Sequence, residues 1–80
     1  MAISEVLKLI QGFSSGHERE KKNIQASQTN LSTLISTAQT PEQIENAQQA
    51  LRNIAGDSSR YVESSLGHQA LSNVLENKTT

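Results

Sequence analysis

Apolar side chains recur every three to four residues from the start of this chain to Ala38, which is the spacing of one face of an α-helix. At the start the repeat is formed by Ile3, Val6, Leu7, Ile10 and Phe13. It continues in one heptad register, with a polar middle, through His17, Glu20, Ile24, Ser27, Leu31, Leu34 and Ala38. Weak helix formers crowd the region between, namely Gly12, Ser14, Ser15 and Gly16. The sequence predicts a first helix over 1–13, a break near 12–16 and a second helix over 17–38, and one bent helix is the alternative.

A helix start is predicted at Thr40-Pro41-Glu42-Gln43. Thr40 can cap the free amides, Pro41 suits the first helical position, and Gln43 completes a capping-box pattern. The apolar face of this helix consists of Ile44, Ala47, Leu51 and Ile54, with Ala50 and Ala55 beside it. Gly56 is a C-terminal stop signal, so we predict a helix over 41–55.

The connection between these two predicted helices is short, and short connections favour antiparallel neighbours. Residues 17–38 and 41–55 should therefore form a central helical hairpin, in which Leu31, Leu34 and Ile35 oppose Ile44, Leu51 and Ile54. A further helix over 58–76, capped by Asp57 or Ser58, has an apolar face that Gly67 interrupts. Residues 77–80 are expected to be a frayed tail.

These patterns predict an all-α chain of three to four helices, elongated or loosely bundled, forming one small unit over residues 1–80. Leu, Ile, Val and Phe contribute only 18 of the 80 residues, so the core can only be small. Cysteine is absent, so no disulfide compensates for the small core. We therefore expect the chain to be a homo-oligomer or to have a constitutive protein partner.

The charge balance excludes some classes of partner. A net charge of −1, from 7 basic and 8 acidic residues, offers no basic surface for nucleic acid. The chain has neither a basic leader before its first apolar residues nor an apolar run long enough to span a membrane. We expect a soluble protein, cytoplasmic or virion-associated, that uses no small-molecule substrate.

Two short motifs resemble a hydrolase nucleophile and a zinc site, but the residues around them do not fit either kind of site. Gly12-Phe13-Ser14-Ser15-Gly16 matches a nucleophile elbow, and Asp57 and His68 follow in the order found in α/β-hydrolases. That elbow needs a strand before it, whereas the preceding residues have helical periodicity. His17-Glu18 begins a zinc-helix motif whose second histidine position holds Lys21. We therefore expect no catalytic residues, no cofactor and no metal site.

The first helix is the predicted protein-interaction site. Its six large apolar residues are more than one thin hairpin can easily cover, and they are Ile3, Val6, Leu7, Leu9, Ile10 and Phe13. The predicted interface residues among them are Ile3, Val6, Leu7, Ile10 and Phe13. They can dock on another subunit, or the helix can fold back into a closed bundle. Membrane contact is the least favoured alternative, because the polar face of this helix is not basic.

Small size and helical-hairpin character favour a non-enzymatic structural or assembly subunit that acts through helix–helix association. Subunits of a virion, a tail or a secretion filament are of this type, and the likeness is one of analogy. The alternative is a small monomeric helical inhibitor or adaptor that binds a protein target.

Overall fold

The computed structural model describes residues 3–12 and 18–79, which are mostly helical, and short turns join the helices within the second range. The helices are α1 (Ile3–Gln11), α2 (Glu18–Thr37), α3 (Pro41–Asn53), α4 (Ala55–Ser58) and α5 (Val62–Thr79). No strand occurs within these two ranges, so the all-α prediction is confirmed. The radius of gyration is 11.9 Å, close to the roughly 11.6 Å expected of a compact domain of this length. The helices thus form a compact globule.

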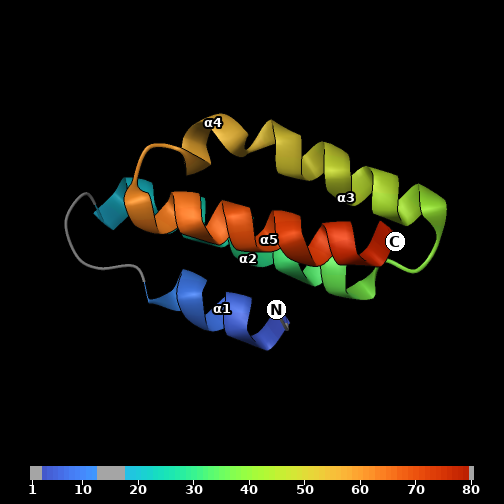
Figure 1. Ribbon diagram of the computed structural model, residues 1–80. Helices are drawn as coiled ribbons and strands as arrows, with labels where there is room; N and C mark the ends of the chain where they lie inside the picture. The colour runs from blue at the N-terminus through green and yellow to red at the C-terminus, as the bar shows by residue number, and fades with distance from the viewer. Residues whose placement is uncertain (1–2, 13–17, 80) are drawn as a thin grey trace.

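The helices are stacked in three layers (Figure 1). Helices α2 and α5 lie side by side in the middle layer, α1 packs on one side of this pair, and α3 and α4 pack on the other. Helices α2 and α5 run in the same direction, whereas α1 and α3 run opposite to them. The predicted antiparallel hairpin is therefore present as α2 and α3, and the chain also reverses between α1 and α2.

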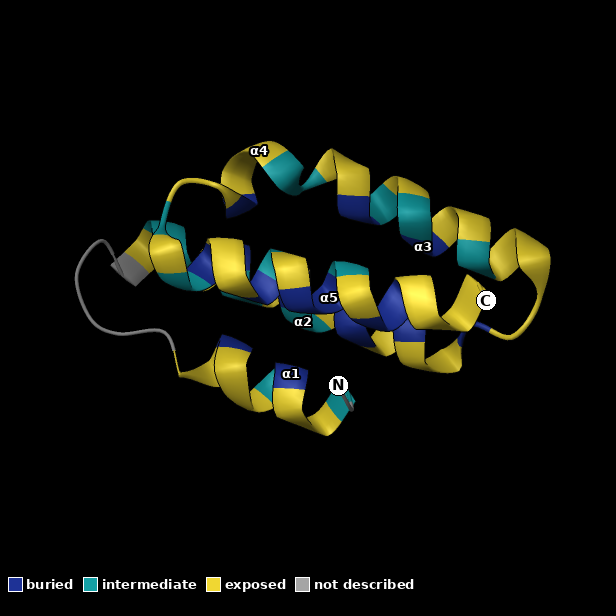
Figure 2. Ribbon diagram, in the orientation of Figure 1, coloured by how far each residue is buried: buried dark blue, intermediate teal, exposed yellow. Residues whose placement is uncertain are grey.

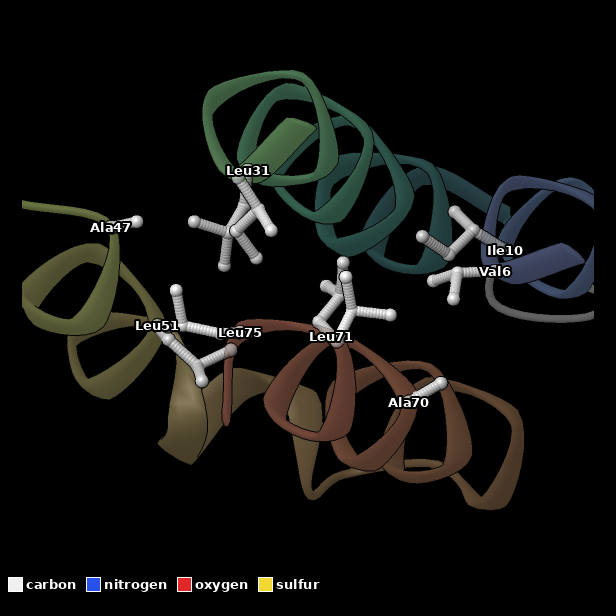
Figure 3. Packing of buried hydrophobic residues seen from close by; sticks show 10 residues of the cluster. Val6, Ile10, Leu31, Ala47, Leu51, Ala70, Leu71 and Leu75 are labelled. Atoms are coloured by element: carbon white, nitrogen blue, oxygen red, sulfur yellow. The ribbon is translucent and has the colours of Figure 1, made fainter. Parts of the chain in front are cut away.

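The core lies between these layers (Figures 2 and 3). Its buried residues come from four helices and are Val6, Ile10, Leu31, Ile35, Ala47, Leu51, Ala70, Leu71, Val74 and Leu75. Helix α5 contacts all four other helices, so it is the central element of the fold. The sequence indicated the α2–α3 hairpin as the centre instead, because the apolar face of α5 looked imperfect.

One predicted hairpin contact needs correction. Leu34 was expected to oppose α3, but its side chain is 37% exposed, whereas Ile35 is fully buried. In the same helix Gln28 is buried and Ser27 is exposed. The buried stripe of α2 runs through Ile24, Gln28, Leu31, Ser32, Ile35 and Ala38. It is rotated from the predicted one because α2 must face α1 and α5 as well as α3.

The start of α3 has the predicted capping box. The Thr40 hydroxyl accepts a hydrogen bond from the Gln43 amide at 3.2 Å, and the Gln43 side chain accepts one from the Thr40 amide, also at 3.2 Å. Pro41 occupies the first turn of the helix. These contacts satisfy amide groups that have no partner inside the helix, so the local sequence is sufficient to define this boundary.

The end of α3 comes earlier than predicted. The helix ends at Asn53, Ile54 forms a turn, and Gly56 lies inside the one-turn helix α4. Gly56 is therefore not the stop that the sequence suggested. The turn redirects the chain so that Ser58 is buried against neighbouring helices.

The last helix also differs from its prediction at both ends. Helix α5 begins at Val62, where the Ser64 hydroxyl accepts a hydrogen bond from the Tyr61 amide at 3.3 Å. It extends to Thr79, through residues expected to fray. The Lys78 ammonium donates to the carbonyl of Ala38 at 3.1 Å, beyond the last turn of α2. This contact ties the end of α5 to α2 and explains the extra turn.

Candidate protein-interaction site

The predicted interface residues of α1 face the core of their own chain. Val6 and Ile10 are 0% exposed, and Ile3 and Leu7 are partly buried. Phe13 lies outside the described residues. Figure 3 shows Val6 and Ile10 pointing toward α2 and α5, with Ala70 on the side of α5 that faces them. We call the face of α2 and α5 that covers α1, and that carries Gln25 and Ala70, the α1 site.

A polar contact closes one end of the α1 site. The Gln25 side-chain amide donates a hydrogen bond to the carbonyl of Ile10 at 2.8 Å. This carbonyl lies in the last turn of α1, where main-chain oxygens lack a partner within the helix. The contact therefore fixes where the C-terminal end of α1 lies along α2.

A polar cluster joins the N-terminal ends of α2 and α5. Glu20 accepts a hydrogen bond from the Tyr61 hydroxyl at 2.8 Å and forms an ion pair with Arg60. The hydrogen bond to Glu20 raises the pKa of Tyr61 above its usual 10, and burial of the phenol adds to this. The hydrogen bond and charge of Glu20 likewise raise the pKa of Arg60. Asp57 lies 3.6 Å from Arg60 as a second anionic neighbour.

Lys21 completes this cluster. Its ammonium lies 3.4 Å from the Glu63 carboxylate and 5.1 Å from the centre of the Tyr61 ring, within cation–π range. Together with Lys78 at the other end, Lys21 links α2 to α5 at both ends of the pair. The two helices that form the α1 site are therefore held together by contacts that do not involve α1.

A buried amide lies in the middle of the same pair. Gln28 is fully buried and donates to the Ser64 carbonyl at 2.8 Å and to the Ser58 hydroxyl at 3.2 Å. The Ser64 hydroxyl donates to the Ser58 carbonyl at 2.7 Å. Gln28 Oε1 accepts no hydrogen bond from the described residues and points at Gly67, where an added Cβ would lie 2.6 Å from it. This network joins α2, α4 and α5.

Sequence reasoning missed this network. Its polar members fall in the polar middle of the heptad register and in the imperfect face of α5, where buried and exposed polar residues look alike. The available signal was Gly67, because a glycine inside a helix often marks a close approach by a neighbouring group.

His68 on α5 is half-buried. Its Nδ1 atom is buried and has no hydrogen-bond partner among the described residues. Burial lowers the pKa of His68 below 6.5, because the charged imidazole loses hydration. His68 is therefore held toward its neutral form.

The residues considered for chemistry do not assemble into a reaction centre. Ser14 and His17 lie outside the described residues, and Asp57 is exposed beside Arg60. Within the described residues, no three histidine, aspartate or glutamate side chains are grouped so that they could hold a metal ion. A pocket of about 200 Å³ between α2 and α4 is lined by Glu20, Asn23, Ile24, Ser27, Ile54, Asp57, Ser58 and Arg60.

Comparison with known proteins adds no relative. No family model matches this chain, and neither a curated protein nor a solved structure matches it significantly. None of the helices in the described ranges is long and apolar enough to cross a membrane. Any functional conclusion must therefore come from the contacts described above.

Proposed function

We propose that this chain is a non-enzymatic structural or assembly subunit that acts through helix–helix association in a larger complex, of the virion, tail or secretion-filament type. The supporting observation is the way α1 is attached. It is a nine-residue helix that forms a layer of its own. Its fully buried residues are Val6 and Ile10, on the face that the sequence marks for docking. A short amphipathic helix on a two-helix face is a common way for proteins to recognise one another.

The test is association of the whole chain in solution. Light scattering coupled to size-exclusion chromatography, over a concentration series, should detect oligomers, and circular dichroism on the same fractions should detect their helix content. We expect the Val6→Asp/Ile10→Asp double variant to lose this association, because each aspartate would bury an unpaired carboxylate.

The matched control places the same charges on the exposed face of α1. Ser4→Asp/Gln11→Asp changes two exposed positions of the helix and should associate as the unsubstituted chain does. A chain that stays monomeric at all concentrations would contradict the proposed function.

The second candidate is a monomeric helical inhibitor or adaptor. It is favoured by the closed core, since α1 packs on its own chain, and by two exposed apolar residues on α5. Val62 is 77% exposed and Leu66 is 48% exposed, one turn apart beside Tyr61. A stably helical monomer of 8.7 kDa at every concentration would support this candidate.

A further inference from the structure

We propose that α1 is exchanged between copies, so that α1 of one chain occupies the α1 site of a second chain. This inference rests on the proposed assembly function and specifies its partner as a second copy of the same chain. Exchange of an identical element between protomers creates a dimer from interactions that the single chain already has.

The first support is that the α1 site does not depend on α1 for its shape. Lys21 and Glu63 link α2 to α5 at one end, and Lys78 links them at the other. Gln28 links them in the middle. Helix α3 covers the opposite side of the pair. When α1 leaves, the surface that received it therefore stays assembled and exposes the apolar face around Ala70 and Leu71.

The second support is that α1 is held by few kinds of interaction. Its described partners are α2 and α5, through the apolar side chains of Val6 and Ile10 and the hydrogen bond from Gln25. A second copy offers the identical side chains in the identical arrangement. Helix α1 therefore packs in the exchanged form as it packs in the single copy, and only the connection between α1 and α2 differs.

The third support is the register of that connection. Every seventh residue from Ile3 to Ala38 belongs to one series, which is Ile3, Ile10, His17, Ile24, Leu31 and Ala38. Its members in α1 and α2 are buried, except Ile3, which is partly buried. In a single copy the chain reverses between α1 and α2, so the two helices have separate axes. Their packing therefore does not require the seven-residue spacing to continue from α1 into α2.

If α1 and α2 form one continuous helix, the spacing must continue, because only then do the buried residues of both lie on the same side of that helix. In the exchanged form, residues 3–37 run as one helix, of about 50 Å at about 1.5 Å per residue. The shared register then keeps the buried faces of α1 and α2 on one side, so that α1 enters the α1 site of the second copy while α2 remains in its own core.

The first experiment shifts the balance between the two forms at the connection. Gly12→Ala/Gly16→Ala favours a continuous helix, and we expect it to lower the dimer dissociation constant more than about tenfold. An added Cβ at Gly12 makes only ordinary contacts, so the single copy tolerates Gly12→Ala. The matched variant Gly16→Pro interrupts a continuous helix and should leave a helical monomer. Equal dissociation constants for these variants would overturn the exchange.

The second experiment mixes two defective chains. Val6→Asp/Ile10→Asp has a defective α1 and an intact α1 site, whereas Ala70→Arg has an intact α1 and a blocked site. Neither should dimerise alone, but the mixture should form a one-to-one heterodimer through one intact α1 and one intact site, detected by native mass spectrometry. Circular dichroism of each chain confirms that it is helical before mixing. Two helical chains that stay monomeric when mixed would overturn the exchange.

The two proposals fail in different ways. Association that persists unchanged in Val6→Asp/Ile10→Asp would overturn the exchange and leave the assembly function standing. A chain without substitutions that never associates would overturn both.

Discussion

At the scale of single residues, the tightest constraint is the contact between Gln28 and Gly67. The amide of Gln28 is held by Ser58 and Ser64, so its Oε1 atom cannot move freely away from α5. A Cβ added at Gly67 would lie 2.6 Å from this oxygen, so the Gln28 side chain would have to shift. Gly67 weakens helix propensity but lets α2 and α5 approach closely at this point.

This contact predicts that Gly67→Ala has opposite effects on the free energy of unfolding when Gln28 is present and when it is replaced. Gly67→Ala should lower the free energy of unfolding by about 1 kcal/mol, because overpacking outweighs the gain in helix propensity. In a Gln28→Ala background the same substitution should raise it by about 0.5–1 kcal/mol. Urea unfolding followed by circular dichroism measures both values.

The control for this cycle is Gly56→Ala in α4. No neighbouring atom lies within 4 Å of a Cβ added there, so the substitution should stabilise the chain in either background. A stabilising Gly67→Ala in the otherwise unsubstituted chain would show that Gln28 does not constrain α5.

His68 predicts a dependence of stability on pH. Its pKa is lowered in the folded chain and returns to about 6.5 on unfolding, so the unfolded chain binds more protons just below pH 6.5. The free energy of unfolding should therefore fall as the pH drops from about 7.5 to 5.5. Chemical denaturation at both pH values, in a His17→Gln background, measures this loss.

Adding His68→Gln to that background should remove most of the loss between these pH values. The quantity compared is the change in the free energy of unfolding between the two pH values. A loss of stability that His68→Gln causes equally at both pH values cancels in this comparison. The same pH dependence with and without His68 would contradict the assignment.

At the scale of elements, the structure separates two leucines that the sequence treats alike. Leu51 is 8% exposed in the core, whereas Leu34 is 37% exposed. Leu51→Asp should lower the free energy of unfolding by about 3 kcal/mol or more, since it buries an unpaired carboxylate. Leu34→Asp should cost less than about 1 kcal/mol. Equal losses of thermal stability, followed by circular dichroism, would place Leu34 in the core.

The sequence was sufficient for elements whose signals are local. The α3 start follows from Thr40, Pro41 and Gln43, and the existence of α1, α2 and α5 follows from apolar periodicity. It was insufficient for the role of α5, because periodicity identifies a helix that buries one face. Helix α5 contacts every other helix, and its buried residues include Ser64, Gly67 and Ala70 as well as leucines. A helix that is buried on several sides lacks the difference between one apolar face and one polar face, and a prediction from periodicity depends on that difference.

In the candidate site, too, the sequence was sufficient for local features and insufficient for contacts between segments distant in sequence. The apolar residues of α1 were identified from their spacing, but the surface that covers them combines α2 and α5, which are distant in sequence. No local pattern indicates that Gln25 or Ala70 lies beside Ile10 and Val6. The prediction that these residues contact a partner remains open to the association experiments above.

At the scale of the whole molecule, α2 and α5 form a parallel pair whose two ends are offset by similar numbers of residues. Lys21 contacts Glu63, a separation of 42 residues, and Ala38 contacts Lys78, a separation of 40. Equal rise per residue in the two helices makes this separation similar at the two ends. Helices α3 and α4 form the connection that the parallel arrangement requires, and they cover one side of it. The other side is left for α1.

This order of elements has a consequence for synthesis on the ribosome. Helix α1 is translated before α2 and α5, but Val6 and Ile10 are buried against both of these helices, and α5 is the last helix described. At about 5–20 residues per second, translation from Gln11 to Thr79 takes roughly 3 to 14 s. During that interval the nascent chain has an apolar helix and no completed surface to receive it.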